Sequence, residues 1–171
     1  MADDRFRAPE DSVAYKELFD AASEGDLKRL EAALLPSLNV NALEADPLEG
    51  RSALHIAAGW GRVSAVQFLL AHGAKVDLPN SEGETPLHEA AFFARPEVII
   101  ALLDAGADLH RKTGDYDYTA LDNVLKYKHM VTPQQIATIT LLLDRGMDVN
   151  AEADHWGSTL VSFKRCVDCR Q

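Results

Sequence analysis

The sequence predicts an all-α solenoid of stacked helix pairs, and three observations carry that prediction. The segment that begins Gly-Arg-Ser-Ala-Leu-His at Gly50 is followed by a similar segment at Gly83, 33 residues later. The histidines of these segments, His55 and His88, keep the same spacing. Both copies close on Leu-Leu-x-x-Gly-Ala after an apolar stripe at helical spacing. A fixed period of this size is typical of stacked repeats, in which neighbouring units bury each other's apolar faces.

Length and charge limit the class of protein. The chain has 171 residues, which suits one domain, and a net charge of −10 from 17 Lys and Arg against 27 Asp and Glu. This acidic balance argues against nucleic-acid binding, which draws much of its affinity from Lys and Arg contacts with phosphate. It favours either a partner with a basic surface or simple solubility.

We expect neither export nor membrane insertion. Polar and acidic residues follow Met1, and the longest apolar blocks fall far short of the roughly 20 residues that span a bilayer. Only two cysteines are present, both in the last six residues, so the fold does not depend on disulfides. We therefore expect a monomeric protein of the cytoplasm, or of the nucleus, that contacts no membrane.

The repeat domain begins with an altered unit. We expect residues 1–14 to form a tail or loose cap and residues 15–171 to form one domain of repeats and their ends. In the first repeat, 15–47, Phe19 stands where the next units have histidine, and the pattern of small and apolar residues returns 36 residues later. Its polar, charged residues suit an end unit, whose outer side faces water.

The second and third repeats, 48–80 and 81–113, give the clearest helix signals. Ser52 and Thr85 are the expected N-caps of the first helices, because a hydroxyl there can accept a hydrogen bond from an unpaired backbone N–H. Pro86 then occupies the first helical position, where its missing N–H costs nothing. Each repeat therefore predicts a capped first helix, a turn and a second helix.

The third repeat departs from the second at the turn between its helices. Ala94 stands where the second repeat has Gly61, and Pro96 follows. A proline disfavours helical conformation at the residue before it, here Arg95. We expect Pro96 to force the turn in place of the glycine.

The fourth repeat, 114–153, carries an insertion between its helices. Its start is offset by 34 residues from the third repeat and its end by 40, so about six residues have been added. Asp122 replaces the histidine, and Thr132 is the expected N-cap of the second helix. Residues 154–171 begin a fifth unit and then lose the pattern, so we expect one helix that serves as a C-terminal cap.

The repeated segments resemble the ankyrin-repeat family. The resemblance rests on the two Leu-Leu-x-x-Gly-Ala endings, on Leu54-His55-Ile56-Ala57-Ala58 and on Thr85-Pro86-Leu87-His88-Glu89-Ala90-Ala91. It implies antiparallel helices within each unit, β-turn fingers that project sideways, and a concave groove that holds a protein or peptide partner. The expected fold is an ankyrin-repeat solenoid of about four repeats plus a C-terminal capping helix.

The groove positions carried over from the family include three aromatic residues. Trp60, Phe93 and Tyr127 occupy the same position in three successive units and would form a row of rings. Aromatic side chains are frequent anchors of binding energy. The competing interpretation is that one or two of these rings pack inward between units. The other predicted partner-binding residues are Glu49, Arg51, Glu82, Glu84, Phe92, Tyr116 and Tyr118.

Two groups of residues could indicate chemistry. We expect His55 and His88 to bond the backbone of adjacent turns, because they recur at the same place in the repeat pattern, and the remaining histidines show no ligand spacing. Cys166 and Cys169 form a lone Cys-x-x-Cys, whereas a structural zinc site needs four ligands and no second pair is present. Free thiols are the favoured interpretation, with an intermolecular disulfide or a shared metal as the alternative.

The sequence thus predicts a non-catalytic protein–protein interaction module, an adaptor or scaffold, without catalytic residues, cofactor or metal. The alternative within this class is an inhibitor or host-directed effector that occludes a target protein. The alternative of another class is a metal- or redox-linked protein that uses Cys166 and Cys169.

Overall fold

A computed structural model describes residues 8, 12–34, 38–45, 50–114, 117–125 and 132–147. The structural statements that follow concern these residues. They contain the helices α1 (Val13–Glu24), α2 (Leu27–Ala33), α3 (Ala53–Gly59), α4 (Val63–Ala71), α5 (Pro86–Phe92), α6 (Pro96–Asp104), α7 (Ala120–Leu125) and α8 (Pro133–Asp144). In this part of the chain, no helix has both the length and the apolar character needed to cross a bilayer.

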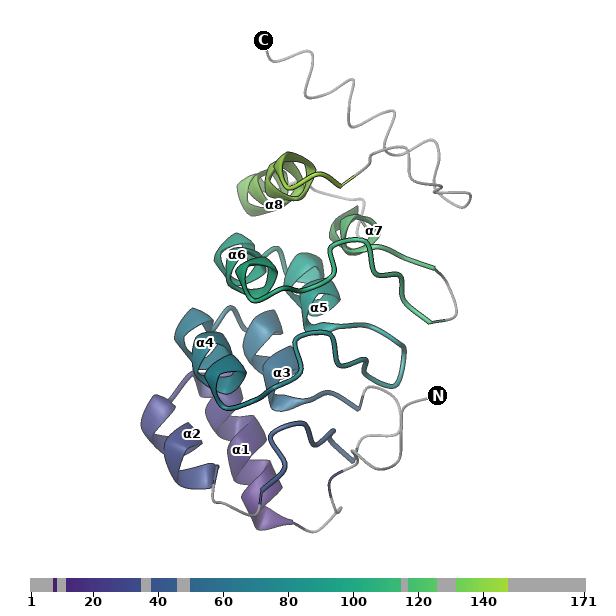
Figure 1. Cartoon of the computed structure of the whole chain (residues 1–171). Coiled ribbons are helices and arrows are strands. Elements are labelled where there is room, and N and C mark those ends of the chain that lie inside the picture. Colours follow the sequence, from purple (N-terminus) through teal and green to yellow (C-terminus); the bar gives the residue numbers. More distant parts are fainter. Residues whose placement is uncertain are drawn as a thin grey trace, which may run out of the picture.

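The helices form four antiparallel pairs that stack in sequence order (Figure 1). The first helices of the pairs make one row, in which α3 packs against α1 and α5, and α5 packs against α7. The second helices make another row, in which α4 packs against α2 and α6, and α6 against α8. The all-α stack of helix pairs predicted from the repeat period is confirmed.

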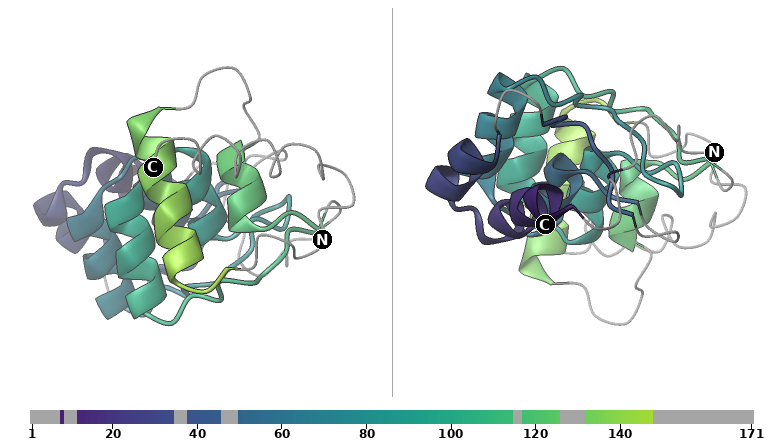
Figure 2. Two further views of the ribbon diagram at one scale, coloured as in Figure 1. Left: turned by 90° about the horizontal axis from the view of Figure 1, so that it is seen from above. Right: turned by 90° about the horizontal axis from the view of Figure 1, so that it is seen from below.

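The segments that precede α3, α5 and α7 project from the stack, and we call them fingers. Finger 2 comprises the described residues 38–45 and 50–52, finger 3 comprises 74–85, and finger 4 comprises the described residues of 107–119. Both views in Figure 2 place the fingers together on one side of the stack. We call the surface made by the first helices and these fingers the finger face.

One apolar core runs through the stack. Leu69, Leu102 and Leu142 occupy equivalent positions in the second helices of three units, and all three are fully buried in the same cluster. The first helices contribute one equivalent leucine each, at positions Leu18, Leu54, Leu87 and Leu121. Side chains about 33 positions apart are therefore neighbours, and no unit has a core of its own.

The predicted helix starts are observed. Ser52, Thr85 and Thr132 are N-caps with capping boxes, and Pro86 occupies the first turn of α5. In the second repeat, the His55 N–H donates to Ser52 Oγ at 3.4 Å, and the Ser52 N–H donates to His55 Nδ1 at 3.2 Å. The starts of α3, α5 and α8 are thus fixed by side chains that are close in sequence.

The buried histidines tie each unit to the next finger, as predicted. Because His55 Nδ1 accepts the Ser52 N–H, Nε2 carries the ring proton and donates to the Glu84 carbonyl oxygen at 3.0 Å. His88 makes the equivalent bonds one unit further along. Burial lowers the pKa of His55 to about 4, and it also lowers the pKa of His88.

A second set of links between units comes from two arginines that sequence reasoning missed. Arg62 Nε donates to the Ser23 carbonyl oxygen at 2.8 Å, and Arg95 Nε donates to the Gly59 carbonyl oxygen at 3.0 Å. A Cβ atom at Gly61 would lie 3.0 Å from Arg95 Cδ, so the aliphatic part of the Arg95 side chain packs against the turn of the preceding unit. The two arginines are 33 residues apart, and this spacing could have indicated from the sequence that they have equivalent roles.

The turn between α5 and α6 corrects one expectation. Pro96 does begin α6 at its first position, but Ala94 makes the turn itself, with a φ of 50° that resembles the 73° of Gly61. Arg95 is non-helical, with φ −107° and ψ 75°, as expected for the residue before Pro96, but the left-handed conformation of the glycine is taken by Ala94, which was not expected. The geometry of the turn is retained, and alanine is held in a left-handed conformation that costs about 1–2 kcal/mol for a residue with a Cβ.

Candidate functional site

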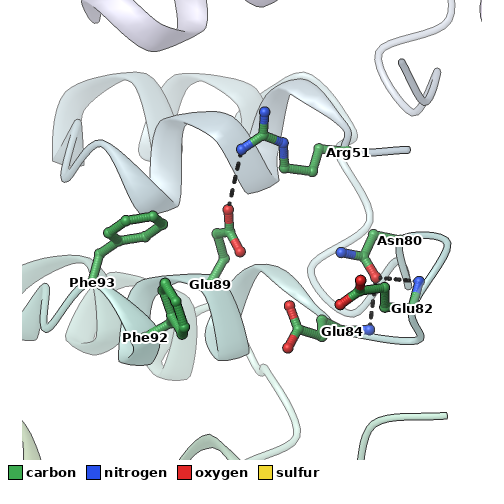
Figure 3. A pocket seen from close by; sticks show the side chains of 7 residues that line it. All are labelled: Arg51, Asn80, Glu82, Glu84, Glu89, Phe92 and Phe93. Carbon is green, nitrogen blue, oxygen red and sulfur yellow. Dashed lines mark hydrogen bonds and ion pairs between the residues drawn. The ribbon is translucent and has the colours of Figure 1, made fainter. Parts of the chain in front are cut away.

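A hollow of about 150 Å³ opens on the finger face where α5 meets finger 3 (Figure 3). Its lining residues are Arg51, Asn80, Glu82, Glu84, Glu89, Phe92 and Phe93. Five of these were predicted as partner-binding residues from the sequence, and Asn80 and Glu89 were not. The hollow thus combines side chains from finger 2, finger 3 and α5 in one place.

Finger 3 is shaped by Asn80, which is 4% exposed. Its side-chain oxygen accepts the backbone N–H groups of Glu82 at 3.0 Å and Glu84 at 2.8 Å. Its own N–H donates to the Glu84 carbonyl oxygen at 2.8 Å. These bonds close a tight turn, because the asparagine side chain takes the place of a backbone acceptor. They hold both glutamates at the rim of the hollow.

Fingers 3 and 4 are in backbone contact behind this rim. Gly83 has a φ of 80°, and a Cβ atom at this position would lie 2.4 Å from the backbone nitrogen of Gly114. The Gly114 N–H points at the Glu82 carbonyl oxygen at 3.4 Å. Only glycine at position 83 allows both the left-handed conformation and the close approach. The finger that carries Glu82 and Glu84 is therefore backed by its neighbour.

The inner end of the hollow holds an ion pair. Glu89 is 8% exposed, and its Oε1 lies 3.5 Å from Nη1 of Arg51. Arg51 Nε also bonds Glu44 Oε2 at 3.3 Å, so one guanidinium is shared by two carboxylates. Gly59 of α3 permits this arrangement, because a Cβ there would lie 3.1 Å from Glu89 Cγ. A carboxylate that is buried this deeply needs a cationic partner, and Arg51 provides one.

Two aromatic rings form the opposite wall. Phe92 is half-buried and Phe93 is 46% exposed, and their centroids are 4.9 Å apart at an interplanar angle of 80°. The Phe93 ring also lies against Gly59, whose Cβ position would be 3.2 Å from Phe93 Cδ2. Trp60 follows directly and is 58% exposed. Neither Trp60 nor Phe93 is packed into the core.

Trp60 and Phe93 occupy equivalent positions, as the C-caps of α3 and α5. Among the exposed large hydrophobic side chains of the described residues, these two are the aromatic ones. Their third predicted partner, Tyr127, lies outside the described residues. The row of rings therefore remains a prediction, of which the structure describes two members.

The other predicted residues fall into two groups. Tyr118 lies in finger 4, where its N–H donates to Thr113 Oγ1 at 3.0 Å and its carbonyl oxygen accepts from His88. Within the described ranges, no cluster of three or more His, Cys, Asp or Glu side chains is arranged to hold a metal ion. Outside the described residues lie Glu49, Tyr116, Cys166, Cys169 and the predicted capping helix 154–171.

Stacked helix pairs with a 33-residue period and projecting fingers define a helical-repeat solenoid. A family model described as ankyrin repeats, in three copies, matches residues 18–113, more than half of the chain. The chain therefore belongs to the ankyrin-repeat family. Ankyrin repeats are in general non-catalytic modules through which proteins bind other proteins.

Three relatives show how similar segments occur in larger proteins. Human Rabankyrin-5 is 40% identical over 72 residues, which are 42% of this chain and 6% of the relative. The probable E3 ubiquitin-protein ligase XBOS31 of Oryza sativa subsp. japonica is 33% identical over 120 residues, which are 70% of this chain and 27% of the relative. The mouse RelA-associated inhibitor is 34% identical over 111 residues, which are 65% of this chain and 13% of the relative. The chain spans less than a third of each relative.

Proposed function

We propose that the chain binds a protein or peptide partner on its finger face, with the hollow beside α5 and the rings of Trp60 and Phe93 as the contact region. One observation carries the proposal. The two exposed aromatic side chains among the described residues lie at the same position of successive units, and one of them lines the hollow. Exposed aromatic rings beside a polar rim are typical of binding surfaces rather than of a solvated exterior.

The partner-bound chain acts as an adaptor or scaffold in this proposal. A second candidate is an inhibitor that occludes its target, which the similarity to the RelA-associated inhibitor favours. The two differ in one observable property. A captured enzyme or binding protein keeps its activity in complex with an adaptor and loses it in complex with an inhibitor.

The test compares two double variants with the wild type in quantitative affinity capture. Trp60→Ala with Phe93→Ala removes both rings of the finger face. Ile100→Ala with Ile136→Ala is the matched control, because these exposed side chains lie on the second helices α6 and α8. Central aromatic anchors contribute about 2 kcal/mol each, so the first variant should lose about thirtyfold in partner affinity if one ring is central and on the order of a thousandfold if both are.

Circular dichroism accompanies the capture and should show unchanged helicity in both variants. Partners that bind the Trp60 and Phe93 variant as tightly as the wild type would end the proposal. The same holds if the Ile100 and Ile136 variant loses the partner and the ring variant does not.

A further inference from the structure

We propose that the hollow lined by finger 3 and α5 receives an arginine side chain of the partner. This inference rests on the proposed function and names the group that the finger face recognises. The hollow presents carboxylates and aromatic faces together, and a planar cation is complementary to both.

The size of the hollow selects a single side chain. Pockets for drug-sized ligands and cofactors measure about 300–1,000 Å³, whereas this one measures about 150 Å³. The hollow opens on the same face as Trp60 and Phe93, so a partner chain that contacts those rings lies next to the opening of the hollow. One extended side chain of such a partner can enter without displacing the fold.

The charge of the lining selects a cation. Three carboxylates line the hollow, those of Glu82, Glu84 and Glu89, against the single guanidinium of Arg51. Arg51 is already shared by Glu89 and by Glu44, which lies beyond the lining. The hollow therefore keeps a net negative charge, and the overall charge of −10 adds a field that attracts basic segments.

The rim carboxylates are held ready for a ligand. Asn80 fixes the backbone of Glu82 and Glu84, as described above. Glu84 Oε1 accepts the side-chain N–H of Asn123 at 3.0 Å, and Asn123 is 1% exposed. Figure 3 shows the Glu84 carboxylate directed toward the side of the hollow that carries Phe92, whereas the Glu89 carboxylate points toward Arg51. Because the backbone of both glutamates and the carboxylate of Glu84 are positioned in advance, a cation binds with less loss of side-chain entropy.

The aromatic wall favours arginine over lysine. The rings of Phe92 and Phe93 meet at 80°, so they present faces in two directions next to the carboxylates. A guanidinium can stack flat on one ring while its N–H groups reach a carboxylate, and it gives up its hydration more readily than an ammonium. Lysine carries the required positive charge, but its ammonium group is not planar and cannot stack on the ring in this way.

The first experiment uses small probes on the whole chain. N-acetyl-arginine amide, N-acetyl-lysine amide and the neutral N-acetyl-norleucine amide are titrated while backbone amide shifts are followed by NMR. We expect the arginine probe to shift amides of residues 80–84 and 89–93, the lysine probe to bind several-fold more weakly, and the neutral probe to leave them unmoved. Raised salt should weaken arginine binding, since part of the attraction is between partly exposed charges.

The second experiment assigns the carboxylates. Glu82→Gln with Glu84→Gln should weaken arginine binding by about tenfold, because it removes two rim charges from the hollow. Glu31→Gln with Glu97→Gln removes the same charge from exposed positions on α2 and α6, and it should leave binding unchanged. Equal binding by both double variants would overturn the inference, as would equal binding of arginine and lysine probes.

Failure of this inference is distinguishable from failure of the proposed function. If the Glu82 and Glu84 variant captures the partner normally while the Trp60 and Phe93 variant does not, the finger face binds the partner without an arginine. If the Trp60 and Phe93 variant captures the partner normally, the proposed function itself fails, whatever the arginine probe does.

Discussion

Each of the two buried histidines uses both ring nitrogens in the neutral form. His55 accepts at Nδ1 from its own N-cap and donates at Nε2 to the carbonyl of Glu84 in the next finger. A second ring proton would break the Nδ1 bond and place a charge in the core. The residue therefore joins two units and at the same time makes that joint sensitive to acid.

Stability should fall as the pH drops from 7 to 5. Burial lowers the pKa of His55 from 6.5 to about 4, so the unfolded chain binds a proton in this window that the folded chain does not. The full contribution is present above pH 6.5 and declines as the pH falls toward 4. For His55 the loss between pH 7 and 5 is about 2 kcal/mol, and His88 adds to it in the same direction.

Urea unfolding at several pH values measures this loss. His110→Gln is the control for the loss of a histidine, since His110 is exposed. A free energy of unfolding that stays constant between pH 7 and 5 would contradict the role given to the buried histidines.

At the scale of the element, local signals were read correctly, whereas among the links between units only those of His55 and His88 were predicted. Ser52, Thr85 and Thr132 could be predicted as N-caps because their partners lie within three residues. Glu89 was not singled out from the sequence, and its burial depends on Gly59 of the facing helix. Such contacts join residues about 30 positions apart. The repeat period predicts that these residues are neighbours, but it does not predict how their side chains are oriented.

The site shows the same division. Arg51, Glu82, Glu84 and the two phenylalanines were named from their place in the repeat, and the hollow brings them together. Asn80 was missed, although an asparagine before a Gly-containing turn is a recognised turn signal. It could have been found by asking which side chain accepts the N–H groups of finger 3.

The turn between α5 and α6 offers a direct test of backbone strain. Ala94→Gly should stabilise the protein by about 1 kcal/mol, because glycine adopts the observed φ of 50° without strain and this gain exceeds its entropic cost. Ala105→Gly is the control at the C-cap of α6, where φ is −83° and glycine should destabilise by about 0.5–1 kcal/mol. Thermal or chemical unfolding measures both changes.

If Ala94→Gly destabilises the protein as much as Ala105→Gly does, the left-handed turn is not strained. The opposite signs expected for two identical substitutions, 11 residues apart in one repeat, make the comparison independent of the general effect of glycine.

At the scale of the whole molecule, stacking creates a surface that no single unit has. The hollow takes Arg51 from before α3, its rim from finger 3 and its rings from α5, and finger 4 supports that rim through Gly114. The continuous core holds these parts in register, since each unit buries its apolar face against the next.

Hydrogen exchange of the complex shows directly whether the finger face is the surface that a partner covers. The partner recovered by the wild-type chain is purified, and deuterium uptake of the chain is compared with and without it. We expect added protection in segments 51–60 and 80–93, with uptake in α4 and α6 unchanged. Protection confined to α4 and α6, with segments 51–60 and 80–93 exchanging as in the free chain, would contradict the assignment of the binding surface.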